Sequence, residues 1–337
     1  MLNHANTMAR ANAYRIGAYV TGLVIWPQAT LAHSDGSGPL TPNEFWHHWN
    51  TDLWLLGPLL LAHWLYGRGV SRLWARAGFG RGISVARVAA FAAGELALVV
   101  ALISPLDALG ETLLSAHMVQ HGLLIAVAPP LLLMGLPGAA FAWALPAETG
   151  GRLARSSSVR TMVHRLSWML HPFAAAAIHG AAVWIWHVPA IFDAALANSG
   201  LHMFEHFTFL ATALLFWQSL VLARRSVPTA AFGIAAAFAT LLHGGFLGAL
   251  ITFAPHVLFS WYVGRTVSWG LEPLEDQQLA GLIMWVPLGL VYFGASLALA
   301  ARLVPASKDA PSQDYRHRDQ TLPADGVRRY SVGRSLK

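Results

Sequence analysis

Two histidine pairs with four-residue spacing carry the main chemical signal in this sequence. His117 and His121 form one pair, and His202 and His206 form the other. Residues i and i+4 lie on the same face of an α-helix, so each pair presents two imidazoles in one direction. Neutral imidazole binds copper, zinc and haem iron. We therefore expect both pairs to lie on helices and to supply ligands to one metal ion.

Other donors are predicted at similar depths along neighbouring helices. The additional candidate ligands are His187, His243 and His256. The sequence contains no cysteine, which excludes thiolate ligation and a CxxC redox pair. Soft thioethers at Met118, Met203 and Met284 favour copper among the metals, although each methionine alone is better explained as a filler of irregular core space. The alternative for the histidines is hydrogen bonding between packed helices.

Three carboxylates are candidates for positioning these ligands. Asp107 and Asp276 are expected to orient imidazoles or to control access, because a carboxylate fixes the tautomer of a ligating histidine. Capping of a helix explains both residues equally well. Glu95 is predicted near the middle of an apolar segment, where an ionisable group is a functional candidate, with His179 as its expected hydrogen-bond partner.

The elements that must position these residues are long apolar segments. The 337 residues are 55% hydrophobic and only 11% charged, which indicates an all-α polytopic helix bundle in a lipid bilayer. About seven transmembrane helices are predicted, at residues 49–66, 83–103, 112–134, 173–188, 201–222, 228–253 and 279–301. In this arrangement the candidate ligands lie in the outer half of the membrane.

Basic residues mark the loops expected on the cytoplasmic side. They are Arg68, Arg72, Arg76, Arg81, Arg87, Arg152, Arg155, Arg160, Arg165, Arg224 and Arg225. Their clustering in alternate connections follows the positive-inside rule, so the net charge of +6 reflects topology and nucleic-acid binding is not expected. The predicted location is the cytoplasmic (inner) membrane of a bacterium, with the mature N-terminus outside and the C-terminus in the cytoplasm.

The two ends of the chain differ from the membrane domain predicted at residues 33–302. Residues 1–32 are typical of a cleavable signal peptide, with Arg10 and Arg15 before a short apolar run and Ala32 at the cleavage position. An uncleaved N-terminal helix is the alternative. Residues 303–337 are rich in polar residues and proline, which predicts a disordered cytoplasmic tail.

Several motifs, in this order, resemble the CtaG family of cytochrome c oxidase assembly factors, from Trp49 to about Ala301. They are Ser104-Pro105-Leu106-Asp107, His117-Met118-Val119-Gln120-His121, Trp184-Ile185-Trp186-His187-Val188-Pro189, His202-Met203-Phe204-Glu205-His206 and the segment from Asp276 to Pro287. The resemblance implies a role in maturing haem-copper oxidases, usually discussed as copper supply. It also implies an oxidase subunit as partner.

The expected function is therefore a non-enzymatic assembly factor. It would receive copper on the outer face, where a periplasmic copper donor is a candidate partner. It would bind the copper at His117, His121, His202 and His206 and pass it to the oxidase subunit. A copper permease using His179, Glu95 and His63 is the second hypothesis, and a haem-binding electron carrier is the third. No Walker A loop or GxSxG elbow supports an enzyme.

Overall fold

The structure is a computed structural model that describes residues 39–303. The predicted signal peptide at 1–32 and nearly all of the predicted tail at 303–337 lie outside the described residues. Within the described range every regular element is helical, which confirms the all-α class. The longest helices are α2 (Leu53–Ala77), α3 (Val85–Leu102), α10 (Pro172–Trp186), α12 (Ser199–Ala223), α13 (Val227–Thr252) and α14 (Pro273–Ala300).

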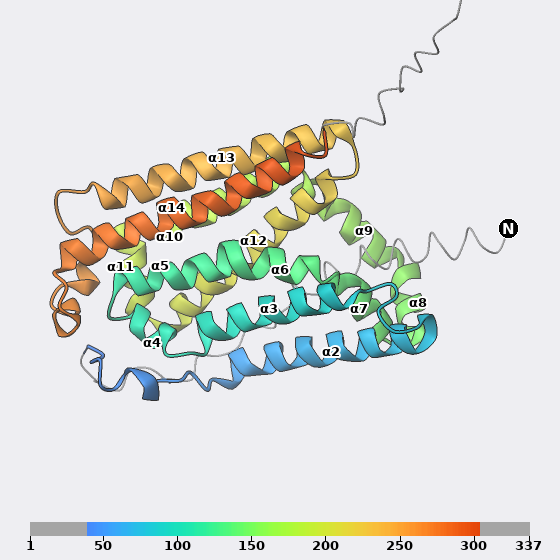
Figure 1. The fold of residues 1–337 in the computed structure, drawn as a ribbon, viewed down its shortest axis with the longest axis horizontal. Coiled ribbons are helices and arrows are strands. Elements are labelled where there is room, and N and C mark those ends of the chain that lie inside the picture. The colour runs from blue at the N-terminus through green and yellow to red at the C-terminus, as the bar shows by residue number, and fades with distance from the viewer. Residues whose placement is uncertain (1–38, 304–337) are drawn as a thin grey trace, which may run out of the picture. The chain divides into compact units, whose positions relative to one another are not determined.

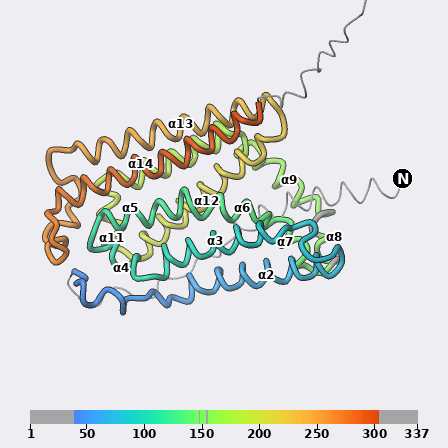
Figure 2. The backbone as a smooth tube through the Cα atoms, in the orientation of Figure 1, coloured from blue at the N-terminus to red at the C-terminus, as the bar shows by residue number. Residues whose placement is uncertain are grey.

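Shorter helices connect or extend these long ones. They are η1 (Phe45–His47), α4 (Leu106–Gly110), α5 (Leu114–Gly122), η2 (Leu123–Val127), α6 (Ala128–Met134), α7 (Pro137–Ala144), α8 (Ala147–Arg155), α9 (Ser157–Leu166), η3 (Ser167–Leu170), α11 (Pro189–Leu196), η4 (Ser260–Tyr262) and η5 (Thr266–Trp269). The backbone trace shows α5 and α6 running end to end through the π-helical turn η2 (Figure 2).

Five helical runs are long and apolar enough to cross a membrane. They are Val85–Leu102, Leu114–Met134, Ser199–Ala223, Val227–Thr252 and Pro273–Ala300. A sixth is the pair Ser157–Leu170 and Pro172–Trp186, which is bent by 78°. Each of the seven expected segments contains a helix, but α2 does not meet the same criterion. The count of about seven spans therefore stays a prediction.

Local sequence signals explain where the long helices begin. Asp52 accepts a hydrogen bond from the Trp54 amide at the start of α2, and Asn198 accepts one from the Leu201 amide at the start of α12. Glu272 and Glu275 form a capping box before α14. These side chains satisfy amide groups that have no partner within the first turn of a helix.

The helices pack around two hydrophobic cores. One core is built from α5 and from α10 to α14, with Phe209, Phe216 and Tyr262 among its fully buried side chains. The other joins α2, α3, α6 and α7, and there Tyr66 stacks on Phe91 with ring centroids 3.7 Å apart. In Figure 1, α13 and α14 lie side by side along one edge of the bundle, and α2 runs along the opposite edge. This packing brings α5, α10 and α12 together in the interior.

Candidate metal centre

Five histidines from three helices form one compact cluster. His117 and His121 lie on α5, His202 and His206 lie on α12, and His187 directly follows α10. Within each pair the ring centroids are 4.2 Å apart. Between helices they are 5.2 Å apart for His117 and His202, 5.5 Å for His121 and His206, and 5.8 Å for His121 and His187. The structure thus places the two i, i+4 pairs face to face.

The cluster is enclosed by protein. All five histidines are buried, and His117 has no exposed surface. Phe192 of α11 and Phe209 of α12 pack against the imidazoles, with the His117 to Phe192 and His121 to Phe209 centroids 5.1 Å and 4.6 Å apart. Imidazoles this close to one another leave no space for a porphyrin between them. The geometry therefore disfavours the haem-carrier hypothesis.

Backbone carbonyls determine which ring nitrogen of two histidines is available. His117 Nδ1 lies 3.3 Å from the Gly110 carbonyl oxygen, and His187 Nδ1 lies 2.7 Å from that of Val183. A carbonyl only accepts hydrogen bonds, so both rings carry their hydrogen on Nδ1. The Nε2 atoms keep their lone pairs, are buried, and have no hydrogen-bond partner among the described residues. This arrangement is typical of histidines that bind metals through Nε2.

A glutamate completes the donor set. One ligand atom each from His117, His202, Glu205 and His206 can be chosen so that all four lie within 4.8 Å of one another. Glu205 is fully buried, and its Oε1 lies 3.6 Å from His121 Nε2, beyond hydrogen-bond distance. Neither carboxylate oxygen has a hydrogen-bond partner among the described residues. A buried carboxylate beside imidazoles that accepts no hydrogen bond is well suited to a cation.

Glu205 was not among the ligands predicted from the sequence, although it lies within the motif at residues 202–206. Two signals were present. A carboxylate within an apolar span is a functional candidate in its own right. Glu205 also follows His202 by three residues, so these two side chains lie on the same helix face.

The two aspartates act on the helix that carries the first histidine pair. Asp276 at the start of α14 accepts hydrogen bonds from the amides of Leu114, at 2.6 Å, and Ser115, at 3.1 Å, and from the Ser115 hydroxyl. It therefore caps α5 from another helix. Asp107 accepts hydrogen bonds from Asn50 Nδ2 at 2.9 Å and from Gln120 Nε2 at 2.7 Å. These bonds give both carboxylates a helix-positioning role, and no direct bond to an imidazole is found among them.

A buried tyrosine supports the same region. The Tyr262 hydroxyl donates to the Gly110 carbonyl oxygen at 2.8 Å, the same atom that His117 contacts. Burial raises the pKa of Tyr262 well above its usual range, and the charge of nearby Asp276 raises it further. The phenol therefore stays protonated and keeps this hydrogen bond at physiological pH.

Three expectations about the other candidates need correction. Glu95 does not contact His179, because its carboxylate lies 2.7 Å from Nδ1 of His63 on α2. His243 lies outside the cluster and accepts a hydrogen bond from the indole N–H of Trp184 at 3.3 Å. His256 is exposed in the segment after α13. The rotation of α3 and α13 about their axes, set by packing, directs Glu95 and His243 away from the cluster, and His256 lies beyond the end of α13.

Comparison with known proteins identifies the family of this chain. The family described as "Cytochrome c oxidase caa3 assembly factor (Caa3_CtaG)" matches residues 64–305, which is most of the chain. The chain belongs to this family. The Caa3_CtaG match covers every helix that contributes to the cluster, and the resemblance inferred from the motifs is thereby confirmed.

Curated relatives of this Caa3_CtaG protein are uncharacterized. Proteins of Mycobacterium bovis and Mycobacterium tuberculosis are each 26% identical to it over 255 residues, and one of Mycobacterium leprae is 25% identical over the same length. Each match covers 74% of this chain but 38% of the relative. The chain thus spans less than half the length of the curated relatives it matches. No solved structure matches the chain.

Proposed function

We propose that this protein binds a copper ion at the cluster of His117, His121, His187, His202, Glu205 and His206 and transfers it to a subunit of cytochrome c oxidase during assembly. Copper is the cargo in this proposal, and the protein has no enzymatic step. The observation that carries the proposal is the convergence of buried nitrogen and oxygen donors from α5 and α12 within 4.8 Å. Family membership as a cytochrome c oxidase assembly factor supplies the recipient.

The donor set fits a first-row transition metal. Imidazole and carboxylate ligands bind such ions at about 2.0–2.2 Å, so two ligands on opposite sides of one ion are separated by at most about 4.4 Å. Donors within 4.8 Å of one another therefore need only small side-chain rotations to close around an ion. Neutral imidazoles and one carboxylate would keep the net charge of the loaded site low, which suits a buried site.

The place of the cluster in the bundle supports transfer rather than storage deep in the membrane. His117 and His202 lie in the first turns of α5 and α12, and His187 lies just beyond the last turn of α10. All three are thus close to helix ends, where α4 and α11 form the connections. We infer that this end faces the outside of a bacterial cytoplasmic membrane, where a periplasmic donor can load it and an oxidase subunit can receive the ion.

The permease hypothesis has less support. The polar groups that were expected to continue a route across the membrane are engaged with neighbouring residues. His179 contacts the hydroxyls of Thr212 and Tyr292 at 3.0 Å and 3.3 Å, and Glu95 contacts His63. The first group joins α10, α12 and α14, whereas the second joins α2 and α3, so the two groups do not form a continuous row of free ligands.

Copper content of the purified protein tests the proposal. The full chain is purified in detergent, loaded with copper, desalted and analysed for metal, and is compared with His117→Ala/His206→Ala. We expect about one copper per wild-type chain. The double variant should bind copper more than about 100-fold more weakly, since loss of even an outer-sphere partner costs about 10–100-fold.

A matched control replaces two histidines far from the cluster. His164 and His171 are exposed near the bend between α9 and α10, so His164→Ala/His171→Ala should retain wild-type copper. Equal copper in all three proteins would contradict the assigned ligands. The copper content of oxidase from cells that carry each variant then tests transfer. Normal oxidase copper with the His117/His206 variant would contradict delivery while leaving binding intact.

A further inference from the structure

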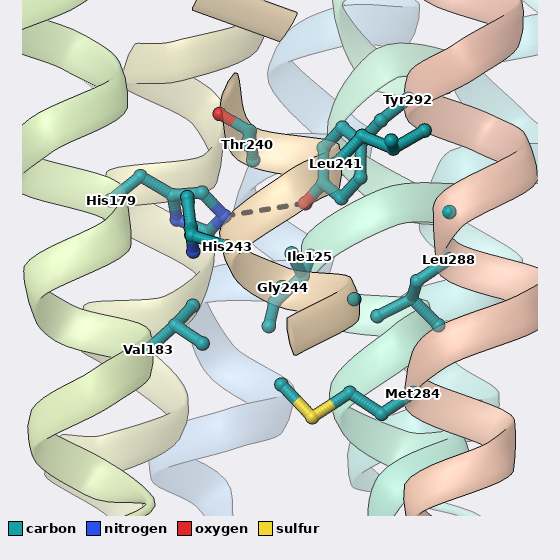
Figure 3. A pocket seen from close by; sticks show the side chains of 12 residues that line it. Ile125, His179, Val183, Thr240, Leu241, His243, Gly244, Met284, Leu288 and Tyr292 are labelled. Atoms are coloured by element: carbon teal, nitrogen blue, oxygen red, sulfur yellow. Dashed lines mark hydrogen bonds between the residues drawn. The ribbon is translucent and has the colours of Figure 1, made fainter. Parts of the chain in front are cut away.

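A mainly apolar cavity with a few polar side chains in its lining lies apart from the histidine cluster. It has a volume of about 20 Å³ and lies between α10, α13 and α14, as shown in Figure 3. His179, His243 and Tyr292 line it, together with apolar residues such as Met284 and Leu288. A cavity needs roughly 10–15 Å³ of this kind of space for one water molecule. The cavity is therefore large enough for a single water and too small for most other ligands.

The hydrogen bonds on one side of this cavity have a defined direction. The Thr212 hydroxyl donates to the Thr208 carbonyl oxygen at 2.8 Å, so it accepts from His179 Nδ1, which lies 3.0 Å away. His179 then carries its hydrogen on Nδ1, and its Nε2 accepts from the Tyr292 hydroxyl at 3.3 Å, drawn as the dashed line in Figure 3. The Tyr292 oxygen still has lone pairs that can accept a hydrogen bond.

The opposite side of the cavity presents a donor. The Trp184 indole only donates, and it donates to His243 Nδ1 at 3.3 Å. Neutral His243 therefore carries its hydrogen on Nε2. This atom is buried, and no described residue accepts its hydrogen. Gly180 makes room for it, because a Cβ at this position would lie 3.1 Å from Nε2. A buried N–H of this kind needs an acceptor.

We propose that this cavity binds one water molecule, which accepts a hydrogen bond from His243 Nε2 and donates one to the Tyr292 oxygen. Both groups line the same cavity, and a water requires at least two polar partners of this kind. Each donor in this chain then faces an acceptor, and all of its hydrogen bonds run in one direction. The chain runs from Trp184 through His243, the water, Tyr292 and His179 to Thr212.

This water-mediated chain connects four helices. Trp184 and His179 lie on α10, Thr212 on α12, His243 on α13 and Tyr292 on α14. Two of these helices, α10 and α12, end or begin at the histidine cluster. The same hydrogen assignment excludes His243 Nε2 as a metal ligand, because a protonated nitrogen has no lone pair to donate.

Coupling between the two sides of the cavity tests the proposal. His243→Phe and Tyr292→Phe are made singly and together in the full chain, and unfolding equilibria are measured in mixed micelles. His243 and Tyr292 hydrogen-bond to different residues and not directly to each other, so independent effects are expected without the water. With the water, we expect the effects to be coupled by about threefold in the unfolding equilibrium constant, the typical size for a polar interaction between membrane helices.

The control cycle pairs His243→Phe with Thr240→Val. Thr240 lines the cavity, but its hydroxyl donates to the Ala236 carbonyl oxygen of its own helix, so additive effects are expected. Additivity in both cycles would overturn the proposal.

Labelling by hydroxyl radicals, generated from bound water in an X-ray beam, gives a readout in the unmodified protein. Met284 lines the cavity, whereas Met118, which is also buried, lies elsewhere in the core. We expect severalfold more oxidation at Met284 than at Met118. Equal oxidation of the two methionines would mean that the cavity holds no water. Loss of Met284 oxidation on copper loading would indicate that the cavity is a metal site. Either result would overturn the proposal.

Discussion

At the scale of single residues, the cluster places polar groups in the apolar interior of the bundle, where their burial is unfavourable. Five imidazoles and the Glu205 carboxylate are buried among phenylalanines, and several of their polar atoms have no partner among the described residues. Burial of such groups without hydrogen bonds is costly, at about 1–3 kcal/mol each in mutational data. A bound cation would compensate this cost, so the metal-free protein should be the less stable form.

Replacement of Glu205 should separate stability from copper binding. Glu205→Leu keeps a similar side-chain volume and removes a buried carboxylate that accepts no hydrogen bond, so we expect the metal-free protein to become more stable by about 1–3 kcal/mol. The same variant should lose copper affinity, because one ligand of the set is missing. Thermal unfolding with and without copper measures both effects.

Glu148→Leu is the matched control for this prediction. Glu148 is exposed on α8 and lies 3.5 Å from Arg152, a surface pair worth little. Its replacement should change stability by less than about 0.5 kcal/mol and leave copper binding unchanged. Destabilisation of the metal-free protein by Glu205→Leu would show that the carboxylate serves the fold.

At the scale of elements, the helix that carries His117 and His121 is interrupted by two prolines. Pro129 and Pro130 have no amide hydrogen, so the Ile125 carbonyl lacks a donor four or five residues further along the chain. The chain forms the π-helical turn Leu123–Val127 at this point. Trp217 of α12 donates its indole N–H to the Ile125 carbonyl oxygen at 2.9 Å. The break in α5 thus creates a hydrogen bond to the helix that carries His202 and His206.

Loss of this indole hydrogen bond should destabilise the protein in a way that depends on Pro129. Trp217→Phe leaves the Ile125 carbonyl buried without a donor, and we expect a cost of about 1–3 kcal/mol in the free energy of unfolding. In a Pro129→Ala background an amide hydrogen is available to that carbonyl, so the cost should fall. A double-mutant cycle by denaturant unfolding measures the difference, and an equal cost in both backgrounds would assign the effect to packing of the ring.

At the scale of the whole molecule, glycines allow α13 and α14 to approach closely. A Cβ at Gly281 would lie 2.5 Å from Thr252 Oγ1 and 2.6 Å from the Gly248 carbonyl oxygen, which is closer than atoms can pack. Small residues at contact points are typical of packed membrane helices. The position of α14 matters for the metal centre, because Asp276 at its start caps α5.

Separation of these helices should therefore weaken both the fold and the site. Gly281→Ala is expected to cost about 1–3 kcal/mol, because backbone atoms of α13 cannot move away without a helix shift. We also expect weaker copper binding, since a displaced Asp276 no longer fixes α5. Gly294→Ala on the same helix is the control, because its Cβ meets no atom within 4 Å. Unfolding and copper titrations of both variants check the prediction, and equal behaviour would contradict it.

The sequence by itself determined the helices and the face on which each histidine pair lies. Helical periodicity and capping depend on residues within a few positions of one another, so every predicted apolar segment contains a helix and each HxxxH pair shares a face. The ordered motifs also identified the family, which the match over residues 64–305 confirms.

Only the tertiary structure decided which side chains meet. It brought Glu205 and His187 to the two pairs, directed His243 and His256 elsewhere, and paired Glu95 with His63 instead of His179. The number of spans also stays a prediction, since five helical runs meet the criterion and a bent pair adds a sixth. The physical reason is that the rotation of each helix about its axis and the choice of its neighbours depend on packing between segments far apart in sequence.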